Sequence, residues 1–198
     1  GFTSSMTAYG TAGGSAAGTV YRQRTADPPG QGELIVDNNG QPVAYDISTS
    51  LNGQSAVTGE FSRIVVTNKG NLGLGSNDTL IITGTTLTGY STNRAEGISL
   101  YGGTLLVPSN YAFSNCFIRI YTNAGSQFCP ASLLTVGSNA MLIVDRAHTL
   151  SNLTVRSGAL LTHDANWASD QYRVELTIGS NLTVDAGARI DVNQKGYR

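Results

Sequence analysis

A short phrase of strand, glycine or asparagine turn and second strand recurs along the chain, and it constrains the fold more than any other feature. In its clearest copies the first strand reads Leu-Thr-Val; these are residues 134–136, 153–155 and 182–184, followed by 141–144, 159–163 and 189–192. Looser copies pair 64–66 with 72–74, 98–100 with 105–107, and 118–120 with 126–129. A chain that repeats one small unit buries its apolar side chains by stacking the copies.

The spacing of the copies favours a solenoid. Leu100, Ile120, Val136 and Val155 follow one another at steps of 20, 16 and 19 residues. The next step, to Val184, is 29, which predicts a loop insertion of roughly ten residues within 164–173. A β-sandwich also has short strands at regular spacing, but it does not repeat one phrase at the spacing of a rung.

Strand alternation predicts which side chains are buried. In Leu-Thr-Val the Leu and Val point to one face and the Thr to the other. Stacking at about 4.8 Å then places Leu134, Leu153 and Leu182 in one inward ladder. We therefore predict an all-β parallel solenoid of about six or more rungs over residues 34–198. Residues 1–33 form a glycine-rich N-terminal arm with the first strand, and 41–60 form a long loop.

Composition excludes several classes of function. The net charge of −1 and the 13% of charged residues provide no basic surface for nucleic acid. No apolar run approaches the roughly 18 residues of a membrane span. The chain opens Gly-Phe-Thr without the features of a signal peptide, so we expect a processed or excised fragment.

The repeated phrases resemble those of pectin-lyase-like right-handed β-helices. The run 181–192, followed by Lys195, Gly196 and Tyr197, also resembles glycine-rich repeats of very large bacterial surface and secreted proteins. The resemblance implies a right-handed parallel β-helix at the cell surface or outside the cell, of a fold found in adhesins, carbohydrate-binding modules, lyases and glycosidases. The last strand stops at Val192 without a capping helix, so we expect end-to-end contacts or contacts with an adjacent module.

The two cysteines and three sequons leave alternatives open. Cys116 and Cys129 form either one disulfide or two free, buried thiols. Asn77, Asn152 and Asn181 each begin a glycosylation sequon, but asparagine before a strand is also what turn chemistry favours.

Two aspartates suggest a metal site. Asp145 and Asp164 each follow the second strand of a regular rung, which would bring the carboxylates to about 5 Å in a stack. Like charges this close must be separated, protonated or bridged by a cation. Calcium is the hard cation that carboxylates favour, and it bridges acidic polysaccharide in the resembling lyases. Either Asn193 or Asp185 is the third member, and the alternative is solvated turn aspartates; Ca²⁺ is the only cofactor suggested.

Aromatic side chains suggest carbohydrate binding. Tyr101 and Tyr121 follow the first strand on consecutive rungs, and Gly137 and Arg156 then continue that column. Tyrosines on a flat face suit sugar rings, while the alternative is packing between rungs. The predicted insertion adds Trp167 and Tyr172, since a protruding loop is a usual place for recognition. Folding back over the core is the other reading of Trp167.

The leading interpretation is a non-catalytic module that binds polysaccharide or serves as a rod in a surface protein. The alternative is a polysaccharide lyase or glycoside hydrolase, with Arg146, Arg156 or Arg173 as a base beside Asp145 and Asp164. A groove that gathers both aspartates and an arginine would favour the enzyme. A flat face with the tyrosines alone would favour binding. We expect His163 in the core or at its rim and His148 on a turn.

Overall fold

The chain folds entirely into β-strands and turns in the part that the structure describes. This computed structural model describes residue 8 and residues 16–41, 47–51, 58–89, 94–121, 125–129, 132–166 and 169–196, with Cys129 described in its backbone alone. None of these residues is helical, so none of them belongs to a helix able to cross a membrane.

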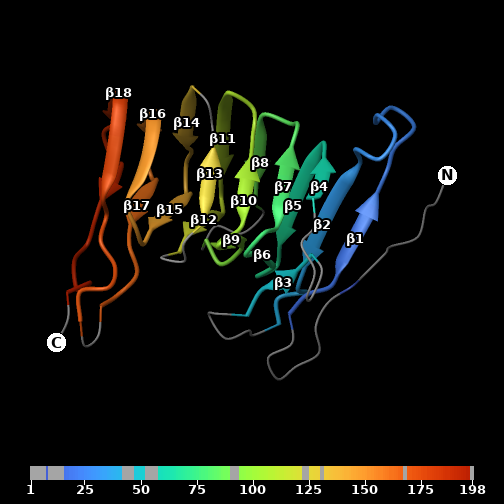
Figure 1. Ribbon diagram of the computed structural model, residues 1–198, viewed down its shortest axis with the longest axis horizontal. Helices are drawn as coiled ribbons and strands as arrows, with labels where there is room; N and C mark the ends of the chain where they lie inside the picture. The colour runs from blue at the N-terminus through green and yellow to red at the C-terminus, as the bar shows by residue number, and fades with distance from the viewer. Residues whose placement is uncertain are drawn as a thin grey trace.

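The strands form four sheets and follow one another along the long axis of the molecule (Figure 1). The three-stranded sheet contains β1 (Thr19–Arg22), β2 (Glu33–Asp37) and β5 (Arg63–Thr67). The four-stranded sheet contains β13 (Gln127–Cys129), β10 (Thr104–Leu106), β7 (Thr79–Ile82) and β4 (Thr58–Phe61). The five-stranded sheet contains β18 (Leu176–Val184), β16 (His148–Val155), β14 (Leu133–Val136), β11 (Asn110–Ser114) and β8 (Thr86–Thr88). The seven-stranded sheet contains β19 (Arg189–Ile190), β17 (Leu160–Thr162), β15 (Met141–Val144), β12 (Phe117–Ile120), β9 (Gly97–Tyr101), β6 (Asn71–Gly75) and β3 (Thr49–Ser50).

Parallel pairing is the rule in these sheets, and the predicted Leu-Thr-Val ladders are confirmed. Leu134 pairs with Leu153, which pairs with Leu182, and the valines two residues later pair in the same way. Of the pairings between named strands, β1 with β2 alone is antiparallel. Side chains at matched positions therefore stack along the molecule.

The predicted columns are wrong in the middle of the chain. Ile120 pairs with Val144 rather than Val136, and Val136 pairs with Phe113. The repeated Leu-Thr-Val sequence does not predict β11, Asn-Tyr-Ala-Phe-Ser, which alternates in the same way with different residues. Without β11, the predicted column of Ile120 and Val136 combines strands of two different sheets.

Two predicted loops have different outcomes. Residues 41–60 were expected to form a long loop, but β3 and the first residues of β4 lie there and pair in parallel with β6 and β7. Residues 42–46 and 52–57 lie outside the described residues. The described residues between Thr162 and Leu176 contain no strand, in agreement with an insertion at 164–173.

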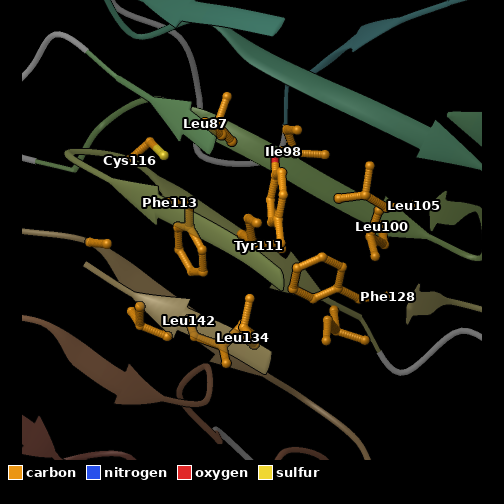
Figure 2. Packing of buried hydrophobic residues seen from close by; sticks show 14 of the residues in the cluster. Leu87, Ile98, Leu100, Leu105, Tyr111, Phe113, Cys116, Phe128, Leu134 and Leu142 are labelled. Atoms are coloured by element: carbon orange, nitrogen blue, oxygen red, sulfur yellow. The ribbon is translucent and has the colours of Figure 1, made fainter. Parts of the chain in front are cut away.

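Apolar side chains from all four sheets belong to one core. Figure 2 shows the part of it where the four-, five- and seven-stranded sheets meet. Its largest members are aromatic: Tyr111, Phe113 and Phe128 are buried, and Tyr111 meets Phe128 edge to face with ring centroids 6.3 Å apart. The Tyr111 hydroxyl has no hydrogen-bond partner within the described structure, and burial raises the pKa of this group. Cys116 is a free, fully buried thiol whose pKa burial raises to about 12, so for this residue the free-thiol alternative holds.

The apolar ladders end in exposed residues at β18 and β19. Leu153 and Leu161 are 1% exposed, whereas Leu182 and Ile190, their partners in the last rung, are each 49% exposed. The last rung therefore buries only one side of its apolar residues.

We expect the same substitution to cost very different free energies at two positions of one ladder. Leu153→Ala should lower the free energy of unfolding by about 2–5 kcal/mol, because it leaves a cavity between packed rungs. Leu182→Ala should cost about 1 kcal/mol or less, because that side chain is already half in water. Urea titration of both variants measures the difference. Equal losses would show that the last rung is packed as tightly as the middle one.

His148 begins β16 and does not lie on a turn as predicted. Its Nε2–H donates a hydrogen bond to the Phe128 carbonyl, at 3.0 Å. Burial lowers the pKa of His148 below its ordinary value, and the nearby Arg146 lowers it further. The folded protein therefore favours the neutral imidazole.

This preference predicts an acid-sensitive component of stability. The unfolded chain takes up a proton near the ordinary histidine value of about 6.5, whereas the folded protein resists it. The contribution is therefore complete above that value and is lost as the pH falls toward the lowered pKa. His148→Gln retains a donor for Phe128 but does not titrate. Between about pH 7.5 and 5.5 the wild type should lose stability relative to this variant in urea titrations. Parallel stability profiles of the two proteins would mean that His148 takes up a proton as readily in the folded state as in the unfolded chain.

Candidate functional site

One outward column of the seven-stranded sheet contains both the tyrosines and the aspartates named from the sequence. The Tyr121 amide donates to the Leu100 carbonyl, and the Asp145 amide donates to the Ile120 carbonyl. The column therefore runs from Tyr101 through Tyr121 and Asp145 to Asp164. The prediction that Gly137 and Arg156 follow Tyr121 is wrong, for the same reason as the misplaced columns: both belong to the five-stranded sheet side.

Arg119 joins the two aspartates. Its Nε donates to Asp145 Oδ2 at 2.8 Å, and its Nη2 donates to Asp164 Oδ2 at 2.5 Å. Arg119 lies on the outer face of β12 and yet is only 3% exposed, and the Asp145 side chain is fully buried. The stacked aspartates are thus bridged by one cation from the neighbouring column, which reduces the repulsion between them. Sequence reasoning missed this residue, because an outward arginine in Phe-Ile-Arg-Ile reads as a solvated side chain.

The two tyrosines stack on each other as consecutive rungs require. Their ring centroids are 4.3 Å apart with the planes inclined by 28°. The Arg119 guanidinium carbon lies 3.7 Å from the Tyr121 centroid. Two groups so close to one ring cannot share a face, so Tyr101 covers one face of Tyr121 and Arg119 covers the other. Tyr121 offers a ligand its edge and hydroxyl, not an open face for a sugar ring.

Gly73 lets the stack approach the sheet. A Cβ at this position would lie 2.2 Å from Ser48 Oγ and 3.3 Å from Tyr101 Cε2. The tyrosine ring and the 47–51 segment therefore both lie where a side chain of β6 would otherwise stand. The result is a continuous row of side chains from Tyr101 to Arg119 and the two carboxylates.

The electrostatics of this row keep Arg119 charged. Burial alone would lower the pKa of Arg119, but Asp145, Tyr121 and Asp164 together raise it above its ordinary value. An arginine that acts as a base needs the opposite shift. Arg119 is therefore suited to hold the carboxylates in place and unsuited to remove a proton from a substrate.

A cavity of about 150 Å³ lies beside the row, on the outer face of the same sheet. Asn71 and Ser99 form part of its floor, with the Ser99 hydroxyl donating to Asn71 Oδ1 at 3.0 Å. Arg119 and Tyr121 border it. The other lining residues are Ile47, Lys69, Arg94, Ala95, Phe117 and Ile143.

The other residues predicted for sugar binding lie elsewhere. Arg156 is exposed and pairs with Asp185 at 3.2 Å. Tyr172 is half-buried in the 164–173 loop, where Asn166 Oδ1 accepts its backbone amide and Asn166 Nδ2 donates to its carbonyl. Trp167 lies outside the described residues. The structure therefore brings together Tyr101 and Tyr121 from this set.

The proposed calcium ligands already have partners in the protein. Asp145 Oδ1 accepts the Asp164 amide at 2.7 Å, and Asp145 Oδ2 accepts Arg119. Asp185 pairs with Arg156 instead. Asn193 follows Ile190 by three residues, as Asp164 follows its partner Leu161, so Asn193 is the residue in register with Asp164. No group of three or more His, Cys, Asp or Glu able to hold a metal occurs in the described parts of the chain. Calcium binding at Asp145 and Asp164 stays a prediction.

Comparison with known proteins adds no relative. No protein-family model, no curated protein and no solved structure matches the chain. The argument about function therefore depends on the geometry of the site.

We expect Arg119 to be a major determinant of stability. Arg119→Met leaves Asp145 buried without a counter-charge and should cost about 3–5 kcal/mol of unfolding free energy. Adding Asp145→Asn should recover part of this loss. Arg156→Met removes the exposed pair with Asp185 and should cost about 1 kcal/mol at most. Urea titration of the variants tests this. A loss no larger for Arg119→Met than for Arg156→Met would mean that solvent or an ion compensates Asp145.

Proposed function

We propose that this chain is a right-handed parallel β-helix module that binds polysaccharide outside the cell and does not catalyse a reaction. The fold part of the proposal is supported by parallel pairing in all four sheets and by apolar ladders that continue across successive rungs. The outer face of the seven-stranded sheet is the binding surface, with the cavity beside Tyr121 at its centre.

The hydrogen bonds that tie Arg119 to both Asp145 and Asp164 are the observation that carries the non-catalytic assignment. A lyase or hydrolase needs an acid or base that can exchange a proton with its substrate. Here the arginine is 3% exposed and donates to both carboxylates, while both oxygens of Asp145 accept hydrogen bonds. Only the Asp164 side chain, 34% exposed, meets solvent.

One observation favours the enzyme alternative. The two aspartates and an arginine do gather beside one cavity, as that alternative requires, although the arginine is Arg119 rather than Arg146, Arg156 or Arg173. Arg173 pairs instead with the exposed Glu175. A lyase reaction with Arg119 as the base would need Arg119 to lose its proton, which its raised pKa opposes.

Hydrogen bonding, rather than ring stacking, is the means of recognition that we propose. Both faces of Tyr121 are covered, so its edge and its hydroxyl are the groups suited to a sugar hydroxyl.

The test compares retention on a panel of insoluble polysaccharides with and without EDTA. Replacing Tyr121 by Phe keeps the stacked rings and removes the hydroxyl, so retention should fall about 3- to 10-fold for the hydrogen bond lost. The melting temperature should change little. Tyr21→Phe, at an exposed tyrosine of β1, is the matched control and should retain wild-type binding.

The same incubations are assayed for new reducing ends and for unsaturated products. We expect neither. Product formation that Asp164→Asn abolishes would establish the enzyme alternative. Retention unaffected by Tyr121→Phe would place the binding surface elsewhere.

A further inference from the structure

β18 combines an unpaired strand edge with the open end of the apolar core. It is the last strand of the five-stranded sheet, and at nine residues it is the longest strand of the described structure (Figure 1). Its ladder residues Leu182 and Val184 are 49% and 43% exposed. The described residues after β19 do not pair with this edge, since the Lys195 carbonyl instead accepts the amide of Asn166.

The main-chain groups of β18 alternate between its two edges. Just before the strand, the Glu175 carbonyl accepts the His148 amide. Just after it, the Asp185 amide donates to the Val155 carbonyl, so the odd-numbered residues turn their main-chain groups toward β16. In a parallel ladder the residues between them turn theirs to the opposite edge. The even-numbered residues of β18 therefore present N–H and C=O groups at the free edge, where no described residue pairs with them.

The sequence of β18 is nearly the same in both directions about Ser180. Residues equally distant from Ser180 are of the same kind: Leu176 and Val184, Thr177 and Thr183, Ile178 and Leu182. In an antiparallel pair of two such strands with Ser180 opposite Ser180, apolar side chains meet on the inner face and threonines on the outer face. The same register places even-numbered residues opposite even-numbered ones, as the hydrogen-bonded positions of an antiparallel pair require.

We propose that two copies of this chain associate end to end through β18, about a two-fold axis beside Ser180. The two β18 strands pair antiparallel, which joins the five-stranded sheets and closes the open ends of the two cores on each other. A two-fold contact uses the same surface twice, so it needs only this end of the molecule. A head-to-tail contact needs a matching parallel edge at the first end, where β1 is antiparallel to β2.

Size and charge agree with such a contact. Nine residues give about 30 Å of strand edge, and two sheets about 10 Å apart span about 20 Å with their outer side chains. Each copy thus offers roughly 600 Å², and the total of roughly 1,200 Å² reaches the lower limit for a stable specific interface. At each end of the paired strands Glu175 lies opposite the partner's Asp185. Arg173 and Arg156 pair with these two carboxylates, so the four side chains carry no net charge.

Leu182→Lys tests the contact, with Thr183→Lys as its control. Both residues are exposed on β18, and the added charge lies on the inner face in the first variant and on the outer face in the second. Sedimentation of the wild type should show a dimer of twice 20.7 kDa that dissociates on dilution. Leu182→Lys should raise the dissociation constant about tenfold or more, because the contact would bury an unpaired charge. Thr183→Lys should remain a dimer.

The contact also makes the effect of Leu182→Ala depend on protein concentration. The small loss of unfolding free energy expected for this variant applies where the dimer has dissociated. A larger loss should appear in urea titrations at concentrations where the wild type is dimeric, because the side chain is then buried between the two copies.

Disulfide formation tests the register. Thr177 and the partner's Thr183 form a non-hydrogen-bonded pair, with Cα atoms about 4.5 Å apart, a distance that a disulfide spans. Oxidation of a mixture of Thr177→Cys and Thr183→Cys proteins should link the two, whereas neither variant alone should give a linked dimer. The wild type controls for links through Cys116 and Cys129.

Several outcomes would overturn the inference. A wild type that stays monomeric at its highest soluble concentration contradicts the contact, as does a dimer that Leu182→Lys leaves intact. Links in either cysteine variant alone, or none in the mixture, contradict the register about Ser180. Assemblies that grow beyond a dimer contradict the two-fold symmetry and indicate a head-to-tail contact.

Discussion

Parallel hydrogen bonding between successive rungs is the constraint on which the rest of this structure depends. It places side chains of matched positions at about the strand spacing of 4.8 Å, so each residue type must tolerate a neighbour directly above it. Leucine over leucine and tyrosine over tyrosine satisfy this without further arrangement. Aspartate over aspartate does not, since two carboxylates at that distance repel. Arg119, from the adjacent column, resolves the conflict by donating to both.

The cations of the outer face therefore differ in their partners. Arg119 is used within the protein: its charge is matched by Asp145 and Asp164, its plane covers Tyr121, and its raised pKa keeps it protonated. Lys69 and Arg94 come from turns that precede β6 and β9, and carbonyl oxygens alone accept their side-chain hydrogen bonds in the described structure. A row that resembles catalytic machinery in its composition is thus held together by hydrogen bonds within the protein.

The sequence predicted the ladders correctly where consecutive rungs have the same tripeptide, and incorrectly where their residues differ. Leu134, Leu153 and Leu182 stack as expected because each begins an identical tripeptide. The sequence did not predict the ladder position of Phe113. Asn-Tyr-Ala-Phe-Ser alternates buried and outward residues as Leu-Thr-Val does, but its residue types differ. That omission separated Tyr121 from Asp145, which the structure shows to be neighbours in one column. Burial of Arg119 could not be predicted, because its partners Asp145 and Asp164 lie 26 and 45 residues away in the sequence.

The two ends of the stack differ in a way that bears on the predicted contacts with a neighbouring module. At the first end, β1 pairs antiparallel with β2, which interrupts the parallel register that an added rung would need. At the other end, β18 and β19 continue the parallel register, and the ladder residues Leu182, Val184 and Ile190 are between 43% and 49% exposed. Unpaired strand edges beside half-exposed apolar side chains favour association with another β-structure. The prediction of an end contact therefore applies to the β18 and β19 end, where a partner strand would gain hydrogen bonds and apolar burial at once.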